Sequence, residues 1–155
     1  MGGNSALSSV VTEILNSTLD AVTTVISSPV NLGAPELLKN AIHQPEMGVL
    51  IGIAGDYPSR LIIEAKRDVY STLAASMYGM ALEGEMLESF VGEIGNMVGG
   101  NMCTNMSERG MLLEVTPPTV LVGQTKLSGF HTALSVAGTV ESVGDMRISL
   151  LITEG

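Results

Sequence analysis

Three polar side chains with hydrogen-bonding chemistry, Ser89, Glu93 and Asn96, lie four and three residues apart in one amphipathic stretch. At about 100° per residue they share one face of a helix, opposite its apolar positions. A hydroxyl, a carboxylate and a carboxamide on one face can together donate and accept hydrogen bonds in the pocket of a partner. The alternative interpretation is a solvated helix face that binds nothing.

Glycines interrupt the same stretch, although each weakens a helix by up to about 1 kcal/mol relative to alanine. They stand at four positions: Gly92, Gly95, Gly99 and Gly100. A solvated face favours Lys, Glu and Ala, whereas glycines remove side chains and let another surface approach the backbone. We therefore expect a flat platform from which Glu93 and Asn96 project into a partner.

The pattern Ser89-x3-Glu93-x2-Asn96, followed 22 positions later by Pro118, resembles the signature of the CheC/CheX/FliY family of bacterial chemotaxis phosphatases. The length of 155 residues is most like CheX. The resemblance implies hydrolysis of the aspartyl-phosphate of a CheY-like response regulator. It implies that Asn96 positions the water, that Glu93 pairs with a lysine of the regulator, and that Ser89 and Pro118 support the contact. It also implies no cofactor of the protein's own, because the regulator supplies Mg²⁺.

A second copy of the pattern, Ser9-x3-Glu13-x2-Asn16, lies 80 residues earlier. The position 22 residues after its asparagine is Leu38, and Pro35 falls three residues short. Larger side chains also replace two of the glycines at the equivalent positions, namely Thr12 and Leu15. We expect this second candidate site to contribute less than half of the activity.

Helices and strands must position these groups, and hydrophobic periodicity predicts them in order. Helices are predicted over 5–26, 68–80 (with Asp68 as cap) and 84–105, and strands over 48–55, 61–63, 111–115, 119–122, 132–140 and 147–153. This order predicts an α+β fold in one domain spanning 1–155, a two-layer sandwich of helices on a mostly antiparallel sheet. The repeated helix pattern, with Gly-Asp before Arg60 and again before Arg147, predicts a pseudo-two-fold internal duplication.

Composition narrows the possible partners and compartments. Seven basic and sixteen acidic residues give a formal charge of −9, which disfavours nucleic acid. A single cysteine excludes an internal disulfide and fits a reducing compartment. The sequence has no signal-peptide pattern and no run of 18 apolar residues. We expect a cytoplasmic protein that binds neither nucleic acid nor membrane.

The remaining reactive residues, His43, His131 and Cys103, lie in unrelated contexts without a hydrolase or metal motif. We therefore expect no metal site and no self-contained hydrolase. The rival class is a non-catalytic regulator-binding or scaffold domain of the FliM type, which shares the fold but lacks the motif. We also expect a homodimer, because no Pro or Lys cluster protects the strand 147–153 if it forms a sheet edge.

Overall fold

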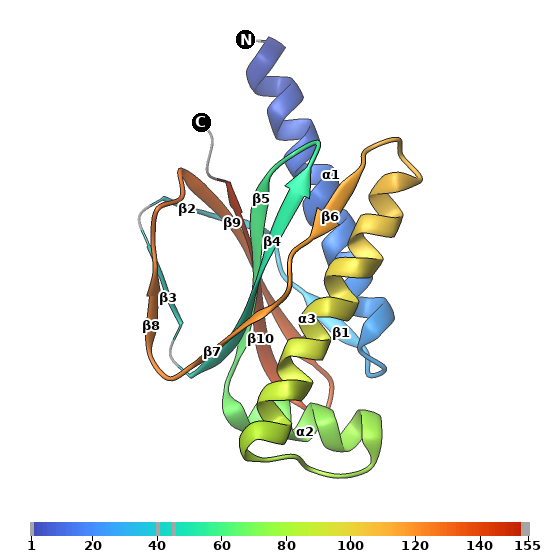
Figure 1. The fold of residues 1–155 in the computed structure, drawn as a ribbon, viewed down its shortest axis with the longest axis vertical. Helices are drawn as coiled ribbons and strands as arrows, with labels where there is room; N and C mark the ends of the chain where they lie inside the picture. The colour runs from blue at the N-terminus through green and yellow to red at the C-terminus, as the bar shows by residue number, and fades with distance from the viewer. Residues whose placement is uncertain (1, 40, 45, 153–155) are drawn as a thin grey trace.

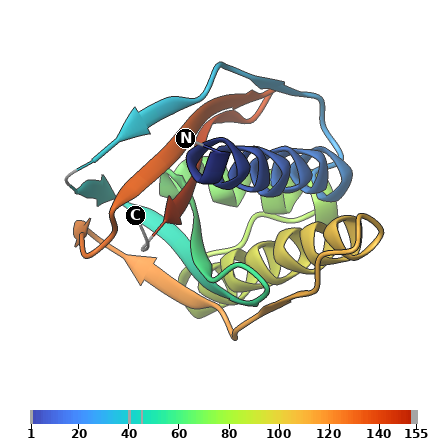
Figure 2. The ribbon, with the colours of Figure 1, turned by 90° about the horizontal axis from the view of Figure 1, so that it is seen from above.

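Three helices and one large antiparallel sheet form the protein in a computed structural model, which describes residues 2–39, 41–44 and 46–152. The helices are α1 (Gly2–Val25), α2 (Arg67–Tyr78) and α3 (Gly84–Ser107). α1 and α3 lie side by side on one face of the sheet, and α2 closes its lower end (Figures 1 and 2). The predicted α+β arrangement of helices on an antiparallel sheet is confirmed.

Eight of the described strands pair into the sheet, all antiparallel. They are β1 (Val30–Leu32), β2 (Glu36–Leu38), β4 (Met47–Gly55), β5 (Ser59–Ala65), β6 (Leu113–Val115), β7 (Thr119–Val122), β9 (Thr132–Val140) and β10 (Gly144–Ile152). The order is β1-β9-β10-β5-β4-β6, with β2 also on β9 and β7 also on β4. A separate ribbon joins β3 (Ile42–Gln44) to β8 (Thr125–Leu127). The predictions missed the short strands β1, β2, β3 and β8.

The strand pairing confirms the predicted internal duplication. Each half consists of a long helix, three short strands and two long strands, so that β1 to β5 correspond to β6 to β10. β1 and β2 pair with β9 just as β6 and β7 pair with β4. β5 pairs with β10, and β3 with β8, across the two-fold. α2 is inserted between the halves.

Apolar residues lie on both faces of the sheet. Alternation along the strands sends one set toward the helices, where Val49 and Ile51 of β4 meet the buried face of α3. The large side chains that α3 buries in this core are Leu87, Phe90, Val91, Ile94, Val98, Met102 and Met106. A smaller cluster on the other face is built on Ile62, Phe130 and Leu151. The helix layer is therefore held by the larger core.

Two sequence predictions are wrong in detail. The residue at the N-cap of α2 is Lys66. Asp68 instead lies in the first turn, where its negative charge interacts favourably with the helix dipole.

β10 is not an edge strand, because β9 and β5 pair with its two sides. The described part of the strand predicted at 147–153 therefore has no free edge through which a dimer could pair. Residue 153 lies outside the described residues. The edges are formed by β1 and β2 on one side and by β6 and β7 on the other.

Candidate active site

The polar face of α3 is exposed because its opposite face is buried against the sheet. Ser89, Glu93 and Asn96 are all exposed, whereas Phe90 and Ile94 are 3% and 0% exposed. None of the three polar side chains makes a hydrogen bond or ion pair with another described residue. Glu93 and Asn96 are offset by about 4.5 Å along the axis, so one bound group can contact both. The structure thus brings the three predicted residues together on one open surface.

Pro118 lies beside this helix but does not share its exposed face. It is half-buried in the connection between β6 and β7. Its Cγ lies 3.8 Å from the position that a Cβ on Gly92 would take. Thr116 holds the connection, since Gly52 N donates to Thr116 Oγ1 and Thr116 N donates to Gly52 O, both at 2.9 Å. Pro118 therefore lies close to the turn of α3 that carries Glu93.

The predicted glycine platform is wrong for three of its four positions. Gly92, Gly95 and Gly99 are buried and face the sheet. A Cβ on Gly95 would lie 2.6 Å from Val49 Cγ2, which is closer than real contacts allow. These glycines let α3 lie close to the strands. Gly100 alone of the four faces open space.

The corresponding face of α1 carries the second candidate site. Ser9 and Asn16 are exposed, and the Glu13 side chain is 44% exposed. Arg109, just after α3, brings its Nη1 to 4.0 Å from Glu13 Oε1. This cation faces the Glu13 carboxylate, whereas Glu93 has no such neighbour among the described residues. Exposed ion pairs are weak, so the contact restrains Glu13 only slightly.

Two reasons for ranking the α1 site lower, the size of Leu15 and the missing proline, are overturned, whereas Thr12 is exposed as that ranking assumed. Leu15 is 2% exposed, so like Gly95 it faces the core and cannot hold a partner away. Pro35 immediately precedes β2 as Pro118 immediately precedes β7, and β2 and β7 are counterparts. The proline of the first copy is therefore present. It falls three residues early because α1 ends two residues sooner after Asn16 than α3 does after Asn96, and because the connection that follows α1 is one residue shorter.

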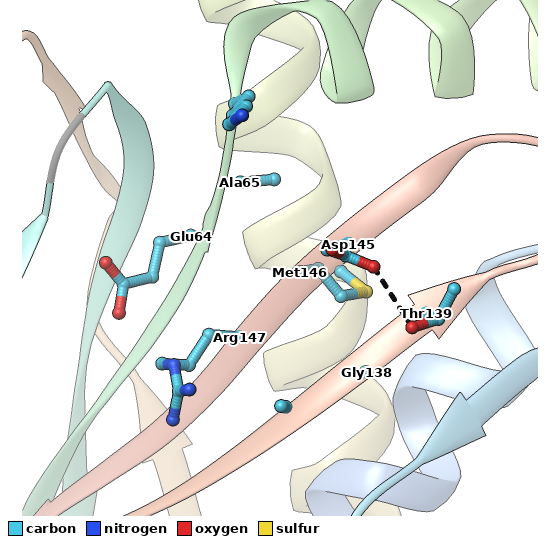
Figure 3. Close-up of a pocket in the computed structure, with 9 residues that line it drawn as sticks. Glu64, Ala65, Gly138, Thr139, Asp145, Met146 and Arg147 are labelled. Carbon is cyan, nitrogen blue, oxygen red and sulfur yellow. Dashed lines mark hydrogen bonds between the residues drawn. The ribbon is translucent and has the colours of Figure 1, made fainter.

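A cavity of about 510 Å³ lies on the sheet face opposite α3, away from the exposed face (Figure 3). Glu64 and Arg147 are cross-strand partners on its wall, with Asp145 and Thr139 nearby. Burial raises the pKa of Glu64 from its ordinary 4.5 to about 7, and the Arg147 charge opposes this shift only in part. Arg147 Nη1 instead donates to Ser135 Oγ at 2.8 Å. The cavity contributes nothing to the face of Glu93 and Asn96.

Glu64→Gln is expected to stabilise the protein at high pH. Between pH 4.5 and 7 folded Glu64 keeps a proton that the unfolded chain releases, so stability falls as pH rises through this window. The full cost above pH 7 is about 3 kcal/mol. Urea denaturation should show the gain of the variant growing from pH 4.5 to pH 8. Exposed Glu141→Gln controls for net charge, and an equal gain at every pH would contradict the burial argument.

Reactive groups elsewhere do not assemble a second site. Burial, followed by the charge of Glu114, raises the pKa of the Cys103 thiol, which makes it a poor nucleophile. His131 is exposed, and the side chain of His43 lies outside the described residues. In the described part of the chain no three His, Cys, Asp or Glu residues are arranged to hold a metal ion. None of its helices is long and apolar enough to cross a bilayer.

Fold and surface together define a class of protein: an α+β domain of two related halves, with an exposed Ser-Glu-Asn face on its second long helix beside a proline. Residues 47–129, more than half of the chain, match the family described as chemotaxis phosphatase CheX. The chain therefore belongs to the CheX family of chemotaxis phosphatases.

Relatives of known sequence or structure cover almost the whole chain. It is 25% identical over 150 residues to the CheY-P phosphatase CheX of Thermotoga maritima, across 94% of this chain and 97% of that protein. A chemotactic CheC-like protein from Shewanella oneidensis MR-1 has 24% identity and a TM-score of 0.74, covering 90% of this chain and 95% of that one. A chain of the CheX–CheY–BeF3–Mg²⁺ complex from Borrelia burgdorferi has 21% identity and a TM-score of 0.72, covering 90% and 97%. The two structures show a shared fold.

Proposed function

We propose that the protein accelerates hydrolysis of the aspartyl-phosphate of a CheY-like response regulator in chemotaxis signalling. The observation that supports this most directly is that Glu93 and Asn96 lie on one exposed helix face. Neither side chain has a hydrogen-bond or ion-pair partner among the described residues. Polar side chains that bind nothing within their own chain are free to bind another. The Thermotoga maritima relative, named as a CheY-P phosphatase, supports the choice of reaction.

Asn96 is the proposed catalytic residue. Its carboxamide oxygen accepts a hydrogen bond from the attacking water, and its NH₂ group donates to a phosphoryl oxygen. The water oxygen bonds to phosphorus as the bond to the aspartyl oxygen breaks, and the carboxylate of the regulator leaves. An acyl phosphate is already activated, so positioning the water in line supplies most of what the reaction lacks. Ser89 borders the contact, and Pro118 supports the helix behind it.

Glu93 is the proposed anchor, pairing with a lysine of the regulator beside its phosphate. Such a charge-assisted hydrogen bond contributes to binding in the ground state and the transition state alike. Glu93→Gln is therefore expected to raise the KM for the phosphorylated regulator about tenfold and to retain most of kcat at saturation. Steady-state phosphate release would measure both. A fall in kcat at unchanged KM would place the charge in the chemical step instead.

The Mg²⁺ ion of the proposed reaction belongs to the partner. The described residues offer no cluster of oxygen ligands for Mg²⁺, whereas the Borrelia burgdorferi complex contains CheY and Mg²⁺. We propose that the regulator brings its own Mg²⁺ and that the reaction takes place in the cytoplasm. A homodimer stays a prediction, and pairing of sheet edges in such a dimer would involve β1 and β2 or β6 and β7, which are the outer strands.

The deciding experiment measures phosphate release from a phosphorylated receiver domain at substoichiometric protein. Acceleration proportional to protein concentration is the expected result. Binding of the regulator without acceleration would instead favour the scaffold function of the FliM type. The presence of both Glu93 and Asn96 favours the enzyme.

A further inference from the structure

Large apolar side chains are exposed where α2 leads into α3. Met86 is 63% exposed, Met80 58% and Tyr78 55%, three of the six large hydrophobic residues most exposed among those described. The Tyr78 ring packs edge to face on Phe90, with centroids 5.6 Å apart and planes at 83°. Phe90 lies one helical turn after Met86, so the aromatic ring is held beside the first turns of α3.

Within this apolar cluster, Met86 continues the polar face of α3. Met86 lies three residues before Ser89 and seven before Glu93, which places all three on one side of the helix. The rise from Met86 to Glu93 is about 10 Å, well within the breadth of a protein interface. A partner that covers Glu93 and Asn96 can therefore also cover Met86, because all three lie on the same side of the helix.

We infer that Tyr78, Met80 and Met86 form an apolar margin of the surface that docks the response regulator, an inference that rests on the proposed function. The occupant is the receiver domain, which reaches Met86 if it covers Glu93 and Asn96. Tyr and Met are enriched in protein interfaces. Polar side chains such as Glu93 and Asn96 lose their hydration when a partner covers them, and the new hydrogen bonds offset much of that cost. Apolar contact around them therefore adds to the affinity. The margin supplies that contact and keeps bulk water from the docked carboxamide.

The first half of the protein provides an internal comparison. The residue that the 80-residue shift places opposite Met86 is Ala6. In the described part of the α1 face, the exposed side chains are polar: Ser9, Thr12, Asn16, Asp20, Thr23 and Thr24. The two helices thus share the Ser-Glu-Asn stripe, but among the described side chains only α3 adds a large exposed apolar residue to it. This difference selects α3 as the docking helix.

Binding and turnover by Met86→Ala and Met86→Asp test the inference. The probe is a CheY-type receiver domain held in its activated form by beryllofluoride and Mg²⁺, in which beryllofluoride stands in for the phosphoryl group. We expect Kd to rise at least fivefold for Met86→Ala and further for Met86→Asp, with kcat at saturation within twofold of wild type. Leu37→Ala is the matched control, because Leu37 is 58% exposed on the edge strand β2. It should leave Kd unchanged.

The outcomes separate this inference from the proposed function. Unchanged Kd for both Met86 variants would overturn the margin while leaving the phosphatase intact. Wild type that binds the regulator through Met86 but releases no phosphate would overturn the proposed catalysis and retain the margin. Sedimentation of the same variants completes the test, since a dimer that dissociates on Met86→Asp would assign the patch to a second copy of this chain and overturn the inference.

Discussion

Asn96→Ala is expected to lower accelerated phosphate release from the phosphorylated regulator at least a hundredfold while leaving the fold intact. Removing one preorganised hydrogen-bonding group that acts in a transition state costs about 10²–10³ in kcat. The side chain is exposed and makes no bond to another described residue, so its loss should change stability by no more than about 0.5 kcal/mol. Single-turnover phosphate release and thermal unfolding would measure the two quantities.

The matched control uses the first helix, where Glu13→Ala with Asn16→Ala removes the equivalent pair. This double variant should retain more than half of the activity, because Arg109 faces Glu13 and because Ala6 stands where α3 has Met86. Near wild-type turnover by Asn96→Ala would remove that residue from the mechanism. Equal losses from the two helices would show that both sites work.

Gly95→Ala is expected to destabilise the protein by about 1–2 kcal/mol. The added Cβ would lie 2.6 Å from Val49 Cγ2 and 2.9 Å from Ile51 Cδ1, so α3 must move away from the sheet or the β4 side chains must leave their rotamers. Overpacking of this kind typically costs 1–3 kcal/mol, more than the helix propensity gained from alanine. Urea denaturation, with the slope checked against wild type, would measure the difference.

Gly100→Ala is the matched control on the same helix. A Cβ there meets nothing within 4 Å, so the substitution should stabilise the protein by up to about 1 kcal/mol. If Gly95→Ala were instead neutral in stability and weakened regulator binding, the glycine would serve docking and the packing explanation would fail. The pair therefore distinguishes the two reasons for glycine in α3.

Local patterns in the sequence were sufficient for the three helices, for six of the ten described strands and for the exposed face of α3, but not for the short strands β1, β2, β3 and β8. Helical spacing placed Ser89, Glu93 and Asn96 on one face, and the burial of Phe90 and Ile94 confirms which face is exposed. Extending the same helical spacing back by seven residues would also have reached Met86. The signal for Glu64 was equally local, since it is the one charged residue within the apolar run Leu61–Ala65. Residues close in sequence share a helix face or strand face by geometry alone.

Only the tertiary structure decided the role of the glycines, the order of the strands and the equivalence of the two prolines, because each depends on what packs against what. Spacing cannot tell whether a glycine faces a partner or the sheet, and the closeness of α3 to β4 made Gly95 a packing residue. Nor does spacing reveal strand order, so β10 became central only through its pairing with β5 and β9. The same pairing identified Pro35 as the counterpart of Pro118, because equivalence in a duplicated fold follows register rather than sequence distance. Long-range contacts of this kind join residues far apart along the chain, and no local preference encodes them.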